Sequence, residues 1–312
     1  MDVISASEAS KSGTTMPTWC GRPRASGPVR EITALNDRRA TRRLGLAPFG
    51  LRDDRAPETA YNQPLEAIHA AAAAGLDAVG FFVVSGSGAV PMPITTDAAL
   101  RREARSRLDA AGVQAVYVEC LYIEPESDFN TLDAALGAGA ELGAHELLCI
   151  GRDPDHGRIA ERLGELAERC APHGLRVNLE FFPNSDVRSL PEALAIIERA
   201  GRRDLGIVID TLHLSRSGGS AADIRAVDSG RLHFAHLCDG LIPPPPAEEL
   251  GTDARDRRYP GEGGLRLREY LAALPESVPL LLECPIIAES AVDLDERARR
   301  AAQAARRLLA TL

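Results

Sequence analysis

Four consecutive apolar segments in the second half of this 312-residue chain each end at a carboxylate or an imidazole. The terminal residues are Glu180, Asp210, His236 and Glu283, and each interval has room for one helix and its loops. Such oxygen-rich sets bind Mn²⁺, Mg²⁺, Co²⁺ or Zn²⁺, and three close carboxylates repel one another without a cation. The pattern therefore predicts one divalent metal ion, with Mn²⁺ as the first candidate. The alternative for any single carboxylate is that it caps the helix that follows.

Short apolar runs alternate with longer amphipathic runs from about residue 43 onward. The short runs are apolar on both faces, as buried parallel strands are, and the long runs have the helical period. We predict strands within 43–51, 76–84, 113–121, 146–151, 175–181, 205–210, 231–237 and 278–284. We predict helices within 64–75, 97–112, 131–143, 158–174, 190–201, 221–227, 265–274 and 295–312.

This alternation predicts an α/β protein with a single (β/α)8 TIM barrel over residues 41–312. An open doubly wound sheet is the alternative, but no G-x-G-x-x-G motif follows the first strand. Residues 1–40 are rich in Ser, Thr, Gly and Pro, which predicts a flexible or extended N-terminal tail without the apolar region of a signal peptide. In a TIM barrel the chemistry lies at the carboxyl ends of the strands, where the four metal-binding candidates fall.

Composition narrows the class of protein. The formal net charge of −9 disfavours nucleic acid as a partner, and no apolar run is long enough to span a membrane. Lys11 is the only lysine, so an imine-forming mechanism within the barrel is disfavoured. Six cysteines without a C-x-x-C pair predict free thiols in a reducing, cytoplasmic compartment.

The loop Pro243–Pro246 is predicted either to line the pocket, to contact another subunit of a homo-oligomer, or to lie on the surface.

Five motifs resemble the xylose isomerase-like TIM-barrel superfamily, in its sugar phosphate isomerase/epimerase family. They are LEFFP at 179–183, IDTLH at 209–213, HLCDG at 236–240, PGEGG at 260–264 and LLLEC at 280–284. The resemblance implies a divalent-metal-dependent isomerase or epimerase of a small sugar or polyol. Such an enzyme transfers a proton next to a carbonyl through a metal-bound enediolate.

The resemblance also assigns roles to residues of this sequence. Glu180, Asp210, His236 and Glu283 match the metal ligands, and the two glutamates match the catalytic proton-transfer pair. His213 matches a substrate-binding residue, and Asp239 matches an acid that supports the site. Arg258 matches a substrate-binding arginine, with Arg257 as the second choice. Glu119, which follows the third strand, is predicted to line the substrate pocket.

Two branches of the superfamily are disfavoured. Phe182 stands where xylose isomerases have a lysine, which argues against a hydride shift. The second and third strands end without histidine, which argues against the three-metal DNA-repair branch. A metal-dependent lyase or dehydratase of a keto-polyol or keto-glycoside remains one alternative, and a non-catalytic metal-binding partner subunit is another. His233, opposite in parity to His236, is predicted to be a structural residue that faces the helices.

Overall fold

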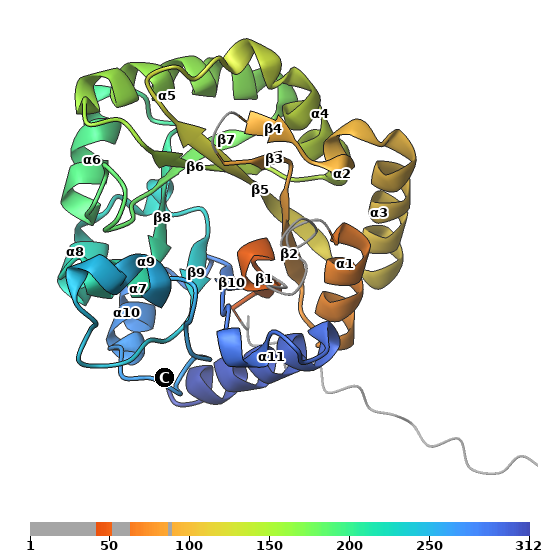
Figure 1. Ribbon diagram of the computed structural model, residues 1–312, viewed down its shortest axis with the longest axis vertical. Coiled ribbons are helices and arrows are strands. Elements are labelled where there is room, and N and C mark those ends of the chain that lie inside the picture. Colours follow the sequence, from red (N-terminus) through yellow and green to blue (C-terminus); the bar gives the residue numbers. More distant parts are fainter. Residues whose placement is uncertain (1–41, 52–62, 87–88) are drawn as a thin grey trace, which may run out of the picture. The chain divides into compact units, whose positions relative to one another are not determined.

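Eight parallel strands close into a barrel in the computed structural model, which describes residues 42–51, 63–86 and 89–312 (Figure 1). The predicted N-terminal tail lies outside the described residues. Around the ring the strands follow the order β1, β10, β9, β8, β7, β6, β5, β2. Their bounds are β1 Leu44–Leu46, β2 Ala78–Phe82, β5 Gln114–Ile123, β6 Glu146–Gly151, β7 Arg176–Glu180, β8 Gly206–Asp210, β9 Ala235–Leu237 and β10 Leu280–Leu282. The predicted TIM barrel is confirmed, and the open sheet is wrong.

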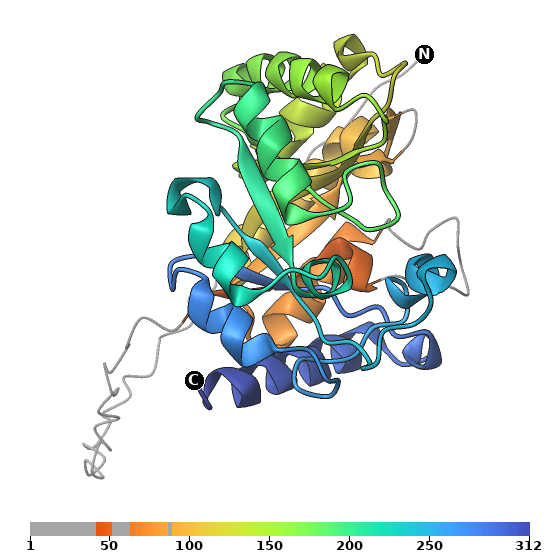
Figure 2. The ribbon, with the colours of Figure 1, turned by 90° about the vertical axis from the view of Figure 1, so that its left-hand side faces the viewer.

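Helices surround the barrel, and α5 and α11 lie on opposite sides of it in both views (Figure 1, Figure 2). All eight predicted helical segments contain a helix: α1 Pro64–Ala73, α3 Ala98–Ala111, α4 Asp133–Leu142, α5 His156–Cys170, α6 Leu190–Arg199, α8 Ala221–Ala226, α10 Leu267–Ala273 and α11 Leu294–Leu309. Three short helices were not predicted: α2 Pro93–Thr96, α7 Thr211–Arg216 and α9 Leu250–Asp253. A two-stranded sheet pairs β3 Val84–Ser85 with β4 Val90–Pro91. In the described part of the chain, none of these helices has the length and apolarity to cross a bilayer.

Alternate residues of each strand face two different cores, because successive side chains of a strand point to opposite sides. The larger core lies between strands and helices and is built mainly from Leu, Ile, Val and Ala. The smaller core includes Tyr117, Leu148, Val208, Phe234 and Leu281, and in it the rings of Tyr117 and Phe234 stack with centroids 4.5 Å apart. Two residues further along four of these strands the inward position is polar, and these residues are Glu119, Asp210, His236 and Glu283, whereas Leu148 is followed by the apolar Ile150. The small core therefore lies directly beneath a site at the barrel mouth.

His233 belongs to a buried polar cluster at the opposite end of the strands. Its Nδ1 lies 2.7 Å from Asn178 Oδ1 and 3.2 Å from Glu146 Oε2, so its structural role agrees with the prediction. The predicted orientation toward the helices is wrong, because β9 begins only at Ala235 and strand alternation does not extend back to His233. Gly206 allows this arrangement, since a Cβ there would overlap with Asn178 and His233.

Candidate active site

The four strand-end residues converge on one buried point. Glu180 and Asp210 are the last residues of β7 and β8, His236 is the middle residue of β9, and Glu283 directly follows β10. His236 Nδ1 lies 3.1 Å from Glu180 Oε1, 3.4 Å from Glu283 Oε2 and 3.9 Å from Asp210 Oδ2. None of the four residues is more than 5% exposed. Their proximity, on which the predicted metal site depends, is therefore present in the structure.

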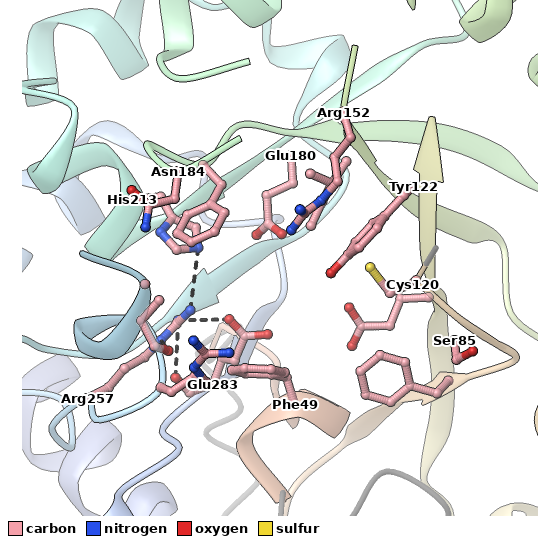
Figure 3. Close-up of a pocket in the computed structure, with 18 of the residues that line it drawn as sticks. Phe49, Ser85, Cys120, Tyr122, Arg152, Glu180, Asn184, His213, Arg257 and Glu283 are labelled. Carbon is pink, nitrogen blue, oxygen red and sulfur yellow. Dashed lines mark hydrogen bonds and ion pairs between the residues drawn. The ribbon is translucent and has the colours of Figure 1, made fainter. Parts of the chain in front are cut away.

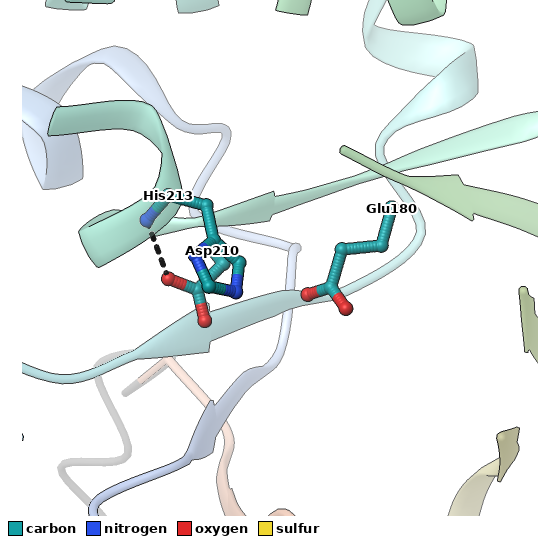
Figure 4. A group of neighbouring side chains, drawn as sticks. All are labelled: Glu180, Asp210 and His213. Atoms are coloured by element: carbon teal, nitrogen blue, oxygen red, sulfur yellow. Dashed lines mark hydrogen bonds between the residues drawn. The ribbon is translucent and has the colours of Figure 1, made fainter. Parts of the chain in front are cut away.

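The ligand atoms of this cluster fit a divalent cation. Two sets of three residues each offer ligand atoms within 4.8 Å of one another. One set is Asp210, His236 and Glu283, and the other is Glu180, Asp210 and His213 (Figure 4). Three carboxylates and imidazole nitrogens form an oxygen-rich donor set of the type that Mn²⁺ or Zn²⁺ accepts. The second set brings in His213, which the sequence had suggested only as a substrate-binding residue.

Arg257 reaches into the same cluster with its guanidinium group. Its Nη1 lies 2.6 Å from Asp210 Oδ2. The same Nη1 lies 2.8 Å from Glu283 Oε2, and Nη2 lies 3.5 Å from His213 Nε2 (Figure 3). The side chain is 2% exposed. Because arginine stays protonated in proteins, this group provides one permanent positive charge against the buried carboxylates.

Arg258, the first choice from the sequence, lies elsewhere. Its Nη1 donates hydrogen bonds to the carbonyl oxygens of Arg257 at 2.6 Å and Asp256 at 3.3 Å, and it does not line the cavity. Asp239 and Arg258 form an antiparallel bridge, with each N–H 2.9 Å from the other's carbonyl oxygen. Neighbouring side chains in such an extended segment point to opposite sides, so Arg257 faces the site and Arg258 faces away. The first choice from the sequence, Arg258, is therefore wrong, and the second choice, Arg257, is the arginine that faces the site.

The two carboxylate oxygens of Asp210 have separate contacts. Oδ1 accepts hydrogen bonds from the backbone N–H groups of Leu212 at 2.7 Å and His213 at 3.0 Å, which caps α7. Oδ2 faces Arg257 and His236. Burial acts to raise the pKa of Asp210, but the charges of Arg257, His213 and His236 outweigh it and hold the pKa below its ordinary value. Asp210 therefore both caps α7 and belongs to the ligand cluster.

Asp239 supports the site through backbone contacts. Its Oδ1 accepts hydrogen bonds from the N–H groups of Gly240 at 2.8 Å and Leu265 at 2.9 Å, and its Oδ2 accepts one from Gly261 at 3.0 Å. These bonds fasten the PGEGG segment to the end of β9. Since Arg257 lies three residues before Pro260, the first residue of that segment, Asp239 acts on the site through the chain that carries this arginine.

A line of hydrogen bonds connects His236 to the pocket wall. His236 Nε2 lies 3.0 Å from Tyr117 Oη, and Tyr117 Oη lies 3.2 Å from Glu119 Oε1. Glu119 lines the cavity, as predicted. Burial, and next the charge of Glu283, raise the pKa of Glu119 well above its ordinary value. The contact of Tyr117 with Nε2 leaves Nδ1 of His236 directed at the carboxylates.

Replacing Tyr117 by Phe is expected to weaken Mn²⁺ binding roughly tenfold, because partners that orient a metal-binding histidine typically contribute 10–100-fold in affinity. The ring still stacks on Phe234, so the fold should persist. Isothermal titration with Mn²⁺ measures the change. Tyr122→Phe is the matched control, since that ring also lines the cavity but has no contact with His236. Equal Mn²⁺ affinities in Tyr117→Phe and the wild type would contradict this role.

The cluster opens into a cavity of about 430 Å³. Part of its wall is aromatic or aliphatic and consists of Phe49, Phe82, Met92, Tyr122, Ile150 and Phe182. Gly251, Ala254 and Arg255 close another side, while Pro243–Pro246 is absent from the wall and largely exposed. The reading in which this loop lines the pocket is therefore wrong. Sequence reasoning also missed Arg152 and Asn184, which both line the cavity.

Comparisons with known proteins give one family and several partial relatives. The sequence model of the family described as "Xylose isomerase-like TIM barrel" matches residues 68–311. An inosose isomerase from Halalkalibacterium halodurans is 34% identical over 118 residues, which are 36% of this chain and 40% of that protein. A 3-dehydroshikimate dehydratase from Pseudomonas aeruginosa is 30% identical over 129 residues, 40% of this chain and 20% of that protein. These matches thus span well under half of either relative.

Solved structures agree on the architecture. A crystal structure described as the IOLI protein with a bound zinc atom superposes with a TM-score of 0.69 and covers 86% of this chain and 98% of that one. The sequences are only 17% identical. The likeness therefore shows a shared fold.

Proposed function

Because this chain belongs to the xylose isomerase-like TIM-barrel family, we propose that it is a divalent-metal-dependent isomerase or epimerase of a small sugar or polyol ketone. The observation that carries the proposal is the convergence of Glu180 and Glu283 on His236 Nδ1, at 3.1 and 3.4 Å, on the wall of a cavity. Two carboxylates beside one substrate-sized space are what a proton transfer between neighbouring positions requires.

Glu180, Asp210, His236 and Glu283 are the residues that would hold the ion, and we propose Mn²⁺. A bound divalent ion would act as a Lewis acid on the substrate carbonyl and its neighbouring hydroxyl, which makes the intervening C–H more acidic. Asp210 does not line the cavity, whereas both glutamates do. We therefore assign Asp210 to binding alone and the two glutamates to binding and proton transfer.

In the proposed reaction one glutamate takes the proton from the carbon next to the carbonyl. The other glutamate returns a proton, to the opposite face in an epimerisation or by way of the neighbouring carbon in an isomerisation. Burial acts to raise the pKa of Glu283, but His236 and Arg257 outweigh it and keep the pKa below its ordinary value. Glu283 is therefore ionised at neutral pH and able to accept a proton.

Arg257 and His213 would orient the substrate's oxygen atoms. Arg257 is fixed by two carboxylates, and the His213 ring packs 4.6 Å from the ring of Phe182, so neither side chain needs to be ordered when substrate binds. Preformed donors of this kind stabilise developing negative charge without reorganisation.

The second candidate is a lyase or dehydratase with the same residues. The partial match to a 3-dehydroshikimate dehydratase favours it. The first step would be the same proton removal, and the intermediate would then lose a β-hydroxyl instead of regaining a proton. The non-catalytic alternative has less support, because a structural metal site would not need two glutamates on the wall of an open cavity.

We also propose a cytoplasmic location, because the five described cysteines are all free and buried, as is usual for proteins of a reducing compartment.

Incubation in D₂O separates the candidates. With Mn²⁺-loaded protein and a panel of an inosose, D-fructose and 3-dehydroshikimate, an isomerase or epimerase should put deuterium next to the carbonyl without loss of water. NMR and mass spectrometry measure both events. Loss of water from 3-dehydroshikimate would select the lyase. Absence of exchange and of elimination on the whole panel would contradict both enzymatic readings.

A further inference from the structure

We propose that the substrate of this pocket carries a carboxylate, and that Arg152 binds that carboxylate. The inference rests on the proposed function in one respect, namely that the substrate occupies the cavity above Glu180 and Glu283. It goes further by giving the substrate a charge and by placing that charge on one wall. Neither the family's motifs nor the sequence had pointed to Arg152.

Arg152 directs its guanidinium group into the cavity. It directly follows β6, and it has the same parity as Leu148 and Ile150, which belong to or pack against the core inside the barrel. Its Cζ lies 4.2 Å from the centroid of the Tyr122 ring. Figure 3 shows the group between Tyr122 and Glu180, pointing toward the centre of the pocket. The contact with the Tyr122 ring helps to hold the guanidinium group in place.

The charge of Arg152 has no carboxylate partner in the part of the chain that the structure describes. Its Nε is buried and without a hydrogen-bond partner there. The adjacent Asp153 is already bound by Arg158, whose Nε and Nη2 lie 2.5 and 2.6 Å from its two oxygens. Glu180, drawn beside Arg152 in Figure 3, forms no ion pair with it. A buried N–H group without a partner is unfavourable, and a ligand with an acceptor would remove that cost.

Arg257 shows the contrast. Three arginines line the cavity, but Arg255 is exposed to solvent, and the guanidinium of Arg257 is neutralised by Asp210 and Glu283 within the protein. Arg152 has no such counter-charge among the described residues. A partly buried cation on a cavity wall without an anion indicates that the anion arrives with the ligand. A carboxylate matches the planar fork of an arginine with two parallel hydrogen bonds.

The barrel fixes where the carboxylate would lie. β6 and β10 are four strands apart in the ring of eight, so Arg152 and Glu283 stand on opposite sides of the barrel mouth. Phe49, Phe82 and Tyr122 are on the wall of the same cavity. The substrate would thus have a carbonyl carbon between the two glutamates, a carboxylate on the side of Glu180, whose strand β7 neighbours β6, and a ring or other compact middle against the aromatic side chains.

A matched pair of ligands tests this. Quinate is a cyclohexane polyol with a carboxylate, and its methyl ester has the same ring without the charge. Isothermal titration of Mn²⁺-loaded wild-type protein should show quinate binding at least about tenfold more tightly than methyl quinate, because charge-assisted bidentate hydrogen bonds are among the strongest in proteins. Equal affinities, or no saturable binding of quinate, would overturn the proposal. So would inorganic phosphate that binds at the same site more tightly than quinate.

Variants locate the effect at Arg152. Arg152→Met should raise the Kd for quinate at least about tenfold and change that for methyl quinate by less than about twofold. Arg152→Lys, which keeps the charge but not the fork, should fall between the two. Arg266→Met is the matched control, since Arg266 is 73% exposed and outside the cavity, and it should bind quinate as the wild type does. If Arg152→Met fails to fold, the comparison of acid and ester on wild-type protein still decides.

The quinate-binding test and the deuterium-exchange test can succeed or fail separately. A preference for quinate that depends on Arg152, in a protein that exchanges no deuterium on any ketose, would retain the carboxylate site and contradict the isomerase. Exchange on neutral ketoses, with no preference for the acid, would retain the isomerase and contradict the carboxylate site.

Discussion

Chelation with EDTA is expected to abolish turnover, and Mn²⁺ or Co²⁺ added after removal of the chelator is expected to restore it. The expected loss is at least about a thousandfold, because without a Lewis acid the C–H next to a carbonyl is a very weak acid. The measurement is the initial rate of deuterium incorporation before chelation, after it, and after each metal is returned. Full activity in excess chelator would contradict both the isomerase and the lyase proposals.

The same experiment has a structural expectation. Three buried carboxylates without a cation would destabilise the barrel mouth by mutual repulsion. In this site Arg257 contacts two of them at 2.6 and 2.8 Å, which provides a counter-charge that does not depend on metal. The metal-free protein should therefore keep its circular dichroism spectrum while it loses activity. Unfolding on chelation would show instead that the ion has a structural role.

The fold could be predicted from the sequence because each strand and each helix is recognisable from the residues within its own segment. Each strand is short, apolar on both faces and separated from the next by an amphipathic helix, and this rhythm alone indicates a parallel barrel. The ligand cluster was predictable for a related reason. Inward residues alternate along a strand, so the polar residue two positions after Val208 or Leu281 must face the barrel mouth if the strand is regular. Asp210 and Glu283 satisfy this rule.

The features that sequence reasoning missed depend on contacts between distant segments. The choice between Arg257 and Arg258 is decided by the bridge of Arg258 to Asp239, which no local pattern reveals. The short helix α7 is only six residues long and owes its start to Asp210, which had been noted as a ligand. Arg152 resembled a loop residue after Gly151, although its parity with Leu148 and Ile150 was a usable signal.

Replacing Glu180 or Glu283 by Gln is expected to lower turnover by about 10²–10⁴-fold at saturating Mn²⁺, which is the range for the loss of a general acid–base group. Glutamine keeps the shape and one oxygen of the side chain but cannot accept the proton. Saturating metal matters, because both residues are also proposed ligands and each variant should bind Mn²⁺ more weakly. The rate at high Mn²⁺ therefore isolates proton transfer from metal affinity.

The two variants should also differ from each other. If the two glutamates act on opposite faces, each single variant still has one base. It should then exchange deuterium into one epimer of the substrate while failing to interconvert the two. Glu146→Gln is the matched control: that carboxylate is 4% exposed, but it begins β6, roughly 16 Å along the strand from the barrel mouth. It should affect stability and leave the exchange rate unchanged. Wild-type rates in both Glu180→Gln and Glu283→Gln would remove the pair from the mechanism, and exchange into both epimers by one variant would mean that a single residue serves both faces.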